Sequence, residues 1–116
     1  MVRAAAKNYN DVTVITSIDQ YQELINELKI NKGKTSLMFR KKMAQQAFTE
    51  TAYYDSLVAN YFNKISKTSF PKKKILHGNL IEKLRYGENP HQIGAVYSQN
   101  KKSTINKIHG KELSYN

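Results

Sequence analysis

The residue types that could do chemistry are densest in residues 84–92, which read LRYGENPHQ. Arg85 carries a planar guanidinium that suits a phosphate or a carboxylate, and Tyr86 adds a hydroxyl and a flat ring. Gly87 permits a positive φ or a close approach to a ligand, and Pro90 favours an extended conformation in the residue before it. The stretch therefore predicts a tight loop that begins with an anion-binding group. An ordinary surface turn with a solvated arginine is the alternative for the Arg-Tyr-Gly triplet taken alone.

A second candidate is Lys7, in the alanine-rich stretch 3–8, which reads RAAAKN. Alanine is the best helix former, and no N-cap residue precedes the stretch, so we expect the last turns of a helix that begins upstream. The helix dipole alone favours a lysine near a helix C-terminus. From these residues alone, Lys7 could have a structural role at the helix C-terminus or a chemical role.

The composition is strongly basic, with 19 Lys plus Arg against 9 Asp plus Glu and a formal net charge of +10. This charge favours phosphorylated small molecules, nucleic acid or a membrane surface as partners. The basic residues are mostly lysines spread along the chain, densest at 72–74, which is more typical of a solvated surface than of a nucleic-acid interface.

Several classes of site and location are excluded by the composition. The chain has no cysteine, so it can form neither a disulfide nor a thiolate metal site. His77 has no second ligand at a metal-binding spacing, and no metal site is predicted. Because no apolar run reaches membrane-spanning length and nothing resembles a cleaved signal, we expect a soluble, cytoplasmic chain without a membrane partner.

The elements that would position Lys7 follow an α/β pattern. The β-branched run 12–16 predicts a short strand buried on both faces of a parallel sheet. Ser17 and Gln20 match a capping box before a helical pattern over 21–28. A strand followed by a capped amphipathic helix indicates a layered α/β domain.

A long helix is predicted next, with Thr35 or Ser36 as its cap and its end near Asn63. Its apolar face is broad and needs more than one neighbour. Asp55 is expected to be a solvated or capping carboxylate. The residues of the broad face are Met43, Ala44, Ala47, Phe48, Ala52, Tyr54, Val58, Tyr61 and Phe62.

The second half of the chain has shorter elements. Residues 66–74 are polar and contain a proline, which predicts a linker. A short strand is predicted at 75–77 and a turn at 78–79. Strands are also predicted at 93–97, whose small residues permit close packing, and at 105–108.

Three strings in this chain resemble one family in the right order. Residues 84–92 resemble the signature that starts the transformylase domain in the AICAR transformylase/IMP cyclohydrolase family of bifunctional purine biosynthesis enzymes. RAAAKN at 3–8 and HGKELSYN at 109–116 are similar to further family strings, and residues 42–55 resemble its connecting helix. The resemblance covers essentially the whole chain but only an internal minority of the family's longer sequence.

The resemblance implies an α/β fold that spans the junction of two domains. Residues 1–66 would be the C-terminal part of the cyclohydrolase domain, the end of a Rossmann-like, methylglyoxal-synthase-like layered domain with a long helix. Residues 67–83 would be a linker. Residues 84–116 would be the first strands of the cytidine-deaminase-like α/β transformylase domain.

The resemblance also implies chemistry. The family transfers a formyl group from 10-formyltetrahydrofolate to AICAR and then cyclises the product, FAICAR, to IMP with loss of water. Lys7 matches the lysine to which the family assigns proton transfer in the cyclohydrolase site, and Arg85 with Tyr86 matches the pair that binds AICAR. The family commonly has His where this chain has Tyr9, so no role is assigned to that ring.

The rest of the family's machinery matches nothing in this chain. Its Gly-rich phosphate-binding segments would lie before Met1 and its transformylase Lys-His pair after Asn116, so the chain alone is predicted to catalyse neither reaction. His91 and Gln92 are expected to hold the loop. The implied partners are nucleotide substrates, folate as a co-substrate and a second copy in the family homodimer, with no bound cofactor.

Two alternatives stay open, the first from the residues and the second from the dimers that the resemblance implies. The first is a small Lys-rich nucleic-acid-binding module, whose binding would weaken steeply with salt. The second is a segment that mainly mediates dimer contacts.

Overall fold

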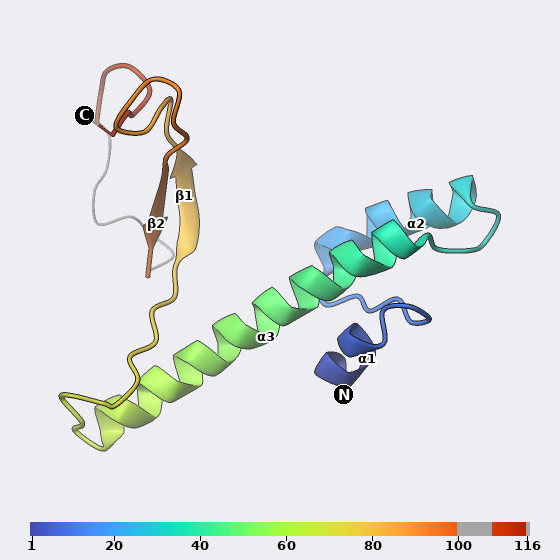
Figure 1. Ribbon diagram of the computed structural model, residues 1–116, viewed down its shortest axis with the longest axis horizontal. Helices are drawn as coiled ribbons and strands as arrows, with labels where there is room; N and C mark the ends of the chain where they lie inside the picture. The colour runs from blue at the N-terminus through green and yellow to red at the C-terminus, as the bar shows by residue number, and fades with distance from the viewer. Residues whose placement is uncertain (100–107, 116) are drawn as a thin grey trace. The chain divides into compact units, whose positions relative to one another are not determined.

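The computed structural model describes residues 1–99 and 108–115, and the chain divides into two compact units, Met1–Lys64 and Ile65–Asn116. The first unit is helical, and the second contains a pair of strands (Figure 1). None of the helices in the described ranges is both long and apolar enough to cross a membrane. The elements in chain order are α1 (Val2–Lys7), η1 (Ile18–Gln20), α2 (Tyr21–Ile30), α3 (Leu37–Ile65), β1 (Asn79–Lys83) and β2 (Ala95–Ser98).

Helix α1 confirms the helix predicted over the alanine-rich stretch. Its residue Ala6 is fully buried, and small side chains at this contact let α1 approach α3 closely. A helix of 6 residues is marginal by itself, so this packing stabilises α1. The core cluster consists of Ala6, Val14, Ala44 and Ala47.

The strand predicted at 12–16 is wrong for the described structure. These residues form no strand, and the only sheet in the described ranges is the pair β1–β2. A strand requires a neighbour for its backbone hydrogen bonds, and none lies beside this segment in the part of the chain described here. The apolar pattern correctly indicated burial, because Val14 is only 8% exposed. The described chain is therefore a set of helices with one antiparallel hairpin, without a parallel sheet.

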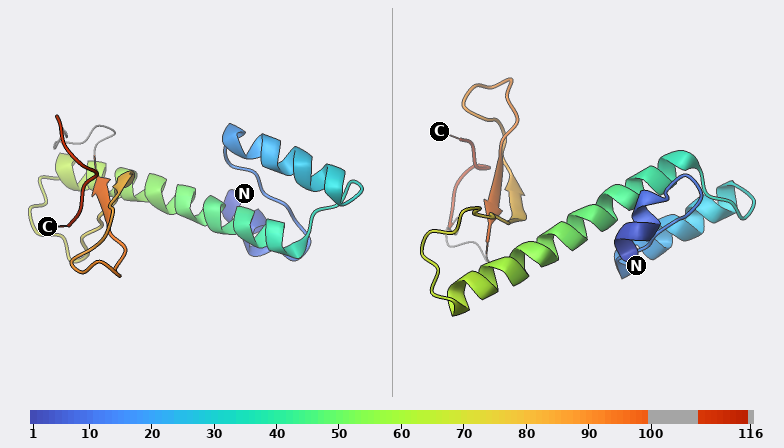
Figure 2. Two further views of the ribbon diagram at one scale, coloured as in Figure 1. Left: turned by 90° about the horizontal axis from the view of Figure 1, so that it is seen from above. Right: turned by 60° about the horizontal axis from the view of Figure 1, so that its bottom comes forward.

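The predicted capping box is confirmed and leads through η1 into α2. The Ser17 N–H donates to Gln20 Oε1 at 3.1 Å, and Gln20 Nε2 donates to Gln46 Oε1 on α3 at 2.6 Å. Glu23 of α2 also forms an ion pair with Lys42 of α3. Helix α2 lies beside the first half of α3 in each view (Figure 1 and Figure 2).

Helix α3 confirms the predicted long helix, and Ser36 is its cap because Ser36 Oγ accepts from the Phe39 N–H at 3.2 Å. Among the described residues, its apolar face is buried mainly in the first half. Buried residues there are Phe39, Met43, Ala44 and Ala47, whereas Tyr54, Tyr61 and Phe62 are 64%, 59% and 59% exposed.

The second unit is built on the antiparallel pair β1–β2. Asn79 pairs with Ser98 and Lys83 with Ala95, with an irregularity between Leu80 and Glu82. The second strand confirms the prediction of a strand around 93–97.

Two other strand predictions have different outcomes. The strand predicted at 75–77 is wrong, because β1 begins at Asn79, where pairing with the end of β2 begins. The strand predicted at 105–108 falls mostly on residues 105–107, which lie outside the described residues. Strand β1 lies within 67–83, the range predicted to be a linker, and those domain boundaries stay a prediction.

Candidate active-site residues in the two units

The loop at 84–92 connects the ends of β1 and β2, so the strand pair positions it. Its backbone closes on itself: the Gly87 N–H donates to the Gln92 carbonyl at 2.8 Å, and the Gln92 N–H donates to the Asn89 carbonyl at 2.9 Å. The Gln92 side chain adds a third bond, because its Oε1 accepts from the Asn89 N–H at 2.9 Å. The predicted tight loop is confirmed, and Gln92 holds it closed.

Gly87 is needed for a reason other than a positive φ. Among the described glycines, only Gly33 and Gly110 have a positive φ. A Cβ added to Gly87 would instead lie 2.9 Å from Gln92 Cβ, closer than real Cβ atoms come to one another. The close approach of Gln92 therefore requires a glycine at this position, and the positive φ that a glycine would also permit does not occur at Gly87.

Arg85 and Tyr86 lie together at the start of this loop. Arg85 Nη2 donates to the Tyr86 hydroxyl at 3.2 Å, and its guanidinium carbon lies 4.8 Å from the centre of the Tyr86 ring. A hydrogen bond to the Ser114 side chain, then the bond and positive charge of Arg85, lower the pKa of Tyr86 below its usual value. The two side chains form one cationic, hydrogen-bonding patch.

Residues near the end of the chain hold this patch from the other side. The Arg85 N–H donates to the Leu113 carbonyl at 2.8 Å, and the Tyr115 N–H donates to the Tyr86 carbonyl at 3.3 Å. Ser114 between them reaches the Tyr86 hydroxyl. This contact was not predicted, because no local pattern in the sequence links Ser114 to a tyrosine 28 positions earlier.

A hollow of about 550 Å³ lies beside the loop. Neither Arg85 nor Tyr86 lines it, although their chain neighbours Leu84 and Gly87 do. The lining residues are Leu84, Gly87, Glu88, Gln92, Ile93, Gly94, Ala95 and Tyr115.

Lys7 is the last residue of α1, and its side chain is exposed. Its ammonium group forms no hydrogen bond or ion pair with any residue in the described part of the chain. The turn after Lys7 is contacted by α3, where Lys41 Nζ lies 5.8 Å from the centre of the Tyr9 ring. Lys7 therefore owes its position to the backbone on either side of it.

Arg40 is the side chain that holds this turn, and the sequence did not single it out. Its Nε donates to the Tyr9 carbonyl at 2.9 Å, and its Nη2 donates to the Asn10 carbonyl at 2.7 Å. Its Nη1 donates to the Thr35 carbonyl just before α3.

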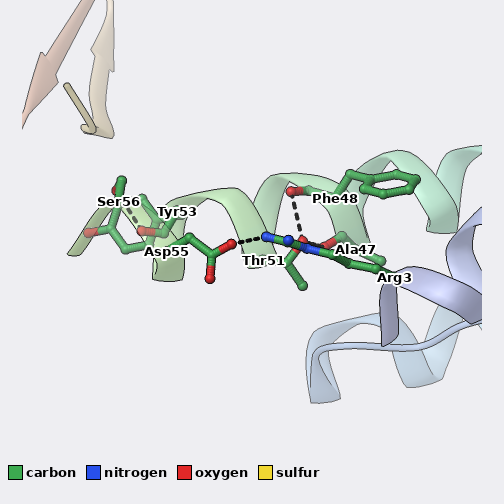
Figure 3. Close-up of polar contacts among 7 residues, drawn as sticks. All are labelled: Arg3, Ala47, Phe48, Thr51, Tyr53, Asp55 and Ser56. Atoms are coloured by element: carbon green, nitrogen blue, oxygen red, sulfur yellow. Dashed lines mark hydrogen bonds and ion pairs between the residues drawn. The ribbon is translucent and has the colours of Figure 1, made fainter. Parts of the chain in front are cut away.

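A further ion pair joins α1 to α3 between Arg3 and Asp55 (Figure 3). The side chains are 53% and 55% exposed, so the pair contributes little to stability. Asp55 is thus the partner of an arginine rather than a cap. In the same region, Thr51 Oγ1 donates to the Ala47 carbonyl at 3.0 Å within α3, as Figure 3 also shows.

Two other observations bear on the chemistry of the chain. A hollow of about 690 Å³ lies next to the ion pair, lined by Met1, Val2, Arg3, Ile15, Thr16, Glu50, Thr51, Tyr54 and Asp55. No group of three or more His, Cys, Asp or Glu that could hold a metal ion occurs among the residues the structure describes.

The comparison with protein families identifies the class of protein. Residues 5–116 match the AICARFT/IMPCHase bienzyme family, so this chain belongs to that family and the resemblance is confirmed. The match favours the enzyme over the nucleic-acid-binding module.

Individual relatives are named bifunctional purine biosynthesis protein PurH. The chain is 44% identical over 120 residues to the protein of Bradyrhizobium diazoefficiens and 43% identical over 121 residues to that of Listeria welshimeri. It is 40% identical over 116 residues to that of Elusimicrobium minutum. Each comparison includes all of this chain but only 23%, 24% and 22% of the respective relative, so the chain spans less than a quarter of their length.

Proposed function

We propose that this chain is the part of a bifunctional purine enzyme that supplies Lys7 to a cyclohydrolase site and Arg85 with Tyr86 to a transformylase site. The complete enzyme would transfer a formyl group from 10-formyltetrahydrofolate to AICAR and then cyclise FAICAR to IMP. The observation that carries the proposal is the Arg85–Tyr86 patch on a closed loop, in a chain of the bienzyme family.

The patch suits a phosphorylated nucleotide such as AICAR. Arg85 uses Nη2 in its bond to Tyr86, and the other N–H groups of the guanidinium can donate to two phosphate oxygens at once. The Tyr86 hydroxyl adds a further hydrogen-bonding group at the same place. Main-chain bonds to residues 113–115 hold both backbones, so a ligand would meet a site that is largely formed beforehand.

Lys7 suits proton transfer because its ammonium is not committed to another group in the described chain. In the cyclisation, the amide nitrogen of FAICAR attacks the formyl carbon and a C–N bond forms. The formyl C–O bond then breaks, and the oxygen leaves as water with one hydrogen from the amide nitrogen and one from the formamido nitrogen. Lys7 would donate a proton to that oxygen or stabilise the negative charge that develops on it.

We also propose the domain organisation that the family implies. Residues 1–66 would complete a Rossmann-like, methylglyoxal-synthase-like domain, 67–83 would be a linker, and 84–116 would begin a cytidine-deaminase-like domain. The division into two compact units next to Lys64 supports a boundary in this region. The complete enzyme would be a cytoplasmic homodimer that uses the folate as a co-substrate.

The test is a chimera in which this chain replaces the matching segment of the Bradyrhizobium diazoefficiens relative. We expect the chimera to perform both reactions. We expect the chain alone to perform neither, because it covers only 23% of that relative. A folded chimera without either activity, or formyl transfer by the chain alone, would contradict the proposal.

A further inference from the structure

Arg40 makes two long-range hydrogen bonds and a third, shorter-range one from its side chain in the first unit. Each of its three nitrogen atoms donates to a backbone carbonyl: Nε to Tyr9, Nη2 to Asn10 and Nη1 to Thr35. Nη1 also lies 3.4 Å from Thr35 Oγ1, which is 2.8 Å from Thr13 Oγ1. One planar group thus ties the turn after α1 to the start of α3.

The turn needs these bonds because two of its carbonyl groups accept no hydrogen bond from the N–H groups of the turn itself. The Asn8 carbonyl accepts from the Asp11 and Val12 N–H groups, at 3.1 and 2.9 Å. The carbonyls of Tyr9 and Asn10 instead accept from Arg40. A lysine could not replace it, since an ammonium is a single point of charge and cannot hold separate carbonyls in a fixed plane.

The same turn determines where Lys7 lies. Ala6, just before Lys7, is buried against α3, and Tyr9 and Asn10, just after it, are held by Arg40. The Lys7 side chain itself has no partner in the described chain. Its ammonium is therefore carried on a short backbone segment that is fixed at both ends.

We propose that Arg40 is a positioning residue for Lys7: it fixes the turn that ends α1 and so holds the Lys7 ammonium where it can transfer a proton. This inference rests on the proposed role of Lys7 in cyclisation. Arg40 would not touch the substrate, and it would act only through Lys7.

The first experiment is Arg40→Lys in the chimera, which keeps the charge and removes the planar fork. We expect kcat for cyclisation to fall about 10- to 100-fold with little change in KM, because small displacements of a catalytic group have effects of this order. Formyl transfer by the same molecule should be unchanged, which also reports that the chimera has folded. Lys42→Gln is the matched control, since Lys42 lies two residues further along α3 and forms an ion pair with Glu23.

A double variant tests whether Arg40 acts through Lys7. If it does, Arg40→Lys should cause no further loss of cyclisation in a chimera that already carries Lys7→Ala. Full cyclisation by Arg40→Lys, an additive loss in the double variant, or an equal fall in formyl transfer would overturn the inference. The proposed function fails separately, and the inference with it, if Lys7→Ala alone leaves cyclisation unchanged.

Discussion

The Lys7 turn and the Arg85–Tyr86 loop are held in place by different kinds of contact. The Lys7 turn depends on side chains far along the sequence, because Arg40 and the buried alanines of α3 hold it. The Arg85–Tyr86 loop depends mainly on main-chain bonds within the loop and to residues 113–115, with one further bond to the Gln92 side chain.

This difference affects how much each site can tolerate. A site held by one guanidinium can be loosened by a single distant substitution that leaves the backbone of the site intact. A loop closed by its own amides and carbonyls is most sensitive where backbone segments approach closely, as at Gly87. Substitutions around the Lys7 turn should therefore change mainly the position of the site, whereas substitutions in the 84–92 loop should change mainly the packing of its backbone.

The largest expected effect is that of Lys7→Ala in the chimera. Removal of the proton-transfer group should lower kcat for cyclisation by about 10²- to 10⁴-fold, while formyl transfer is retained. Steady-state rates of the two reactions measure this. Lys29→Ala removes a lysine from the last turn of the other short helix and should change neither rate; cyclisation that survives Lys7→Ala would contradict the assigned role.

Arg85→Lys should have the next largest effect, on formyl transfer. It keeps the charge but loses the planar fork, so we expect the AICAR concentration at half-maximal rate to rise about tenfold, which corresponds to about 1.4 kcal/mol. The control is Lys73→Gln, which removes an exposed charge from the polar stretch 66–74. An unchanged AICAR requirement would show that the patch does not bind this substrate.

Gly87→Ala tests the closed loop by steric conflict. Its new Cβ would lie 2.9 Å from Gln92 Cβ, and such overpacking costs about 1–3 kcal/mol in free energy of unfolding. Gly33→Ala is the comparison in the first unit, because Gly33 has open space around it but a φ of +84°. Urea unfolding of the chain measures both, and wild-type stability for Gly87→Ala would contradict the close approach.

The smallest effect is on the ionisation of Tyr86. Its pKa is lowered first by the Ser114 hydrogen bond and then by Arg85, so Ser114→Ala should raise that pKa toward the ordinary tyrosine value. A lowered pKa means that the folded state favours tyrosinate more than the unfolded state does. The resulting contribution to the free energy of unfolding is present above about pH 10 and is lost as the pH falls through the folded-state pKa. Ultraviolet titration of Ser114→Ala, with Tyr86→Phe to identify the signal, measures the shift. No change on Ser114→Ala would exclude Ser114 as the main cause.

The parts of the fold that were predictable depend on residues a few positions apart. The Ser17–Gln20 capping box and the Ser36 cap are examples, because each cap bonds to a backbone group within three residues. The closed loop at 84–92 was predictable for the same reason, from its glycine and proline. Arg85 and Tyr86 were placed at the start of this loop from the sequence, but the hydrogen bond between their side chains was not predicted.

The contacts that could not be predicted join residues that are far apart in sequence. Arg40 lies 31 and 30 positions from the Tyr9 and Asn10 carbonyls that it binds, and nothing in its local sequence distinguishes it from a solvated arginine on a helix. The Ser114 contact with Tyr86 has the same character. The segment 12–16 is an example of a local pattern that indicates burial but not strand pairing. Its apolar residues predicted burial correctly, but no neighbouring strand pairs with it in the described residues.

The most direct test of the account is the product that accumulates when the chimera is given AICAR and 10-formyltetrahydrofolate. With Lys7→Ala, FAICAR should accumulate and little IMP should form, whereas with Arg85→Lys at limiting AICAR both products should fall together. This crossed pattern would place the two residues in separate steps of one reaction sequence. The same product pattern from both variants, or a pattern like that of the unsubstituted chimera, would contradict the assignment of this chain to both sites.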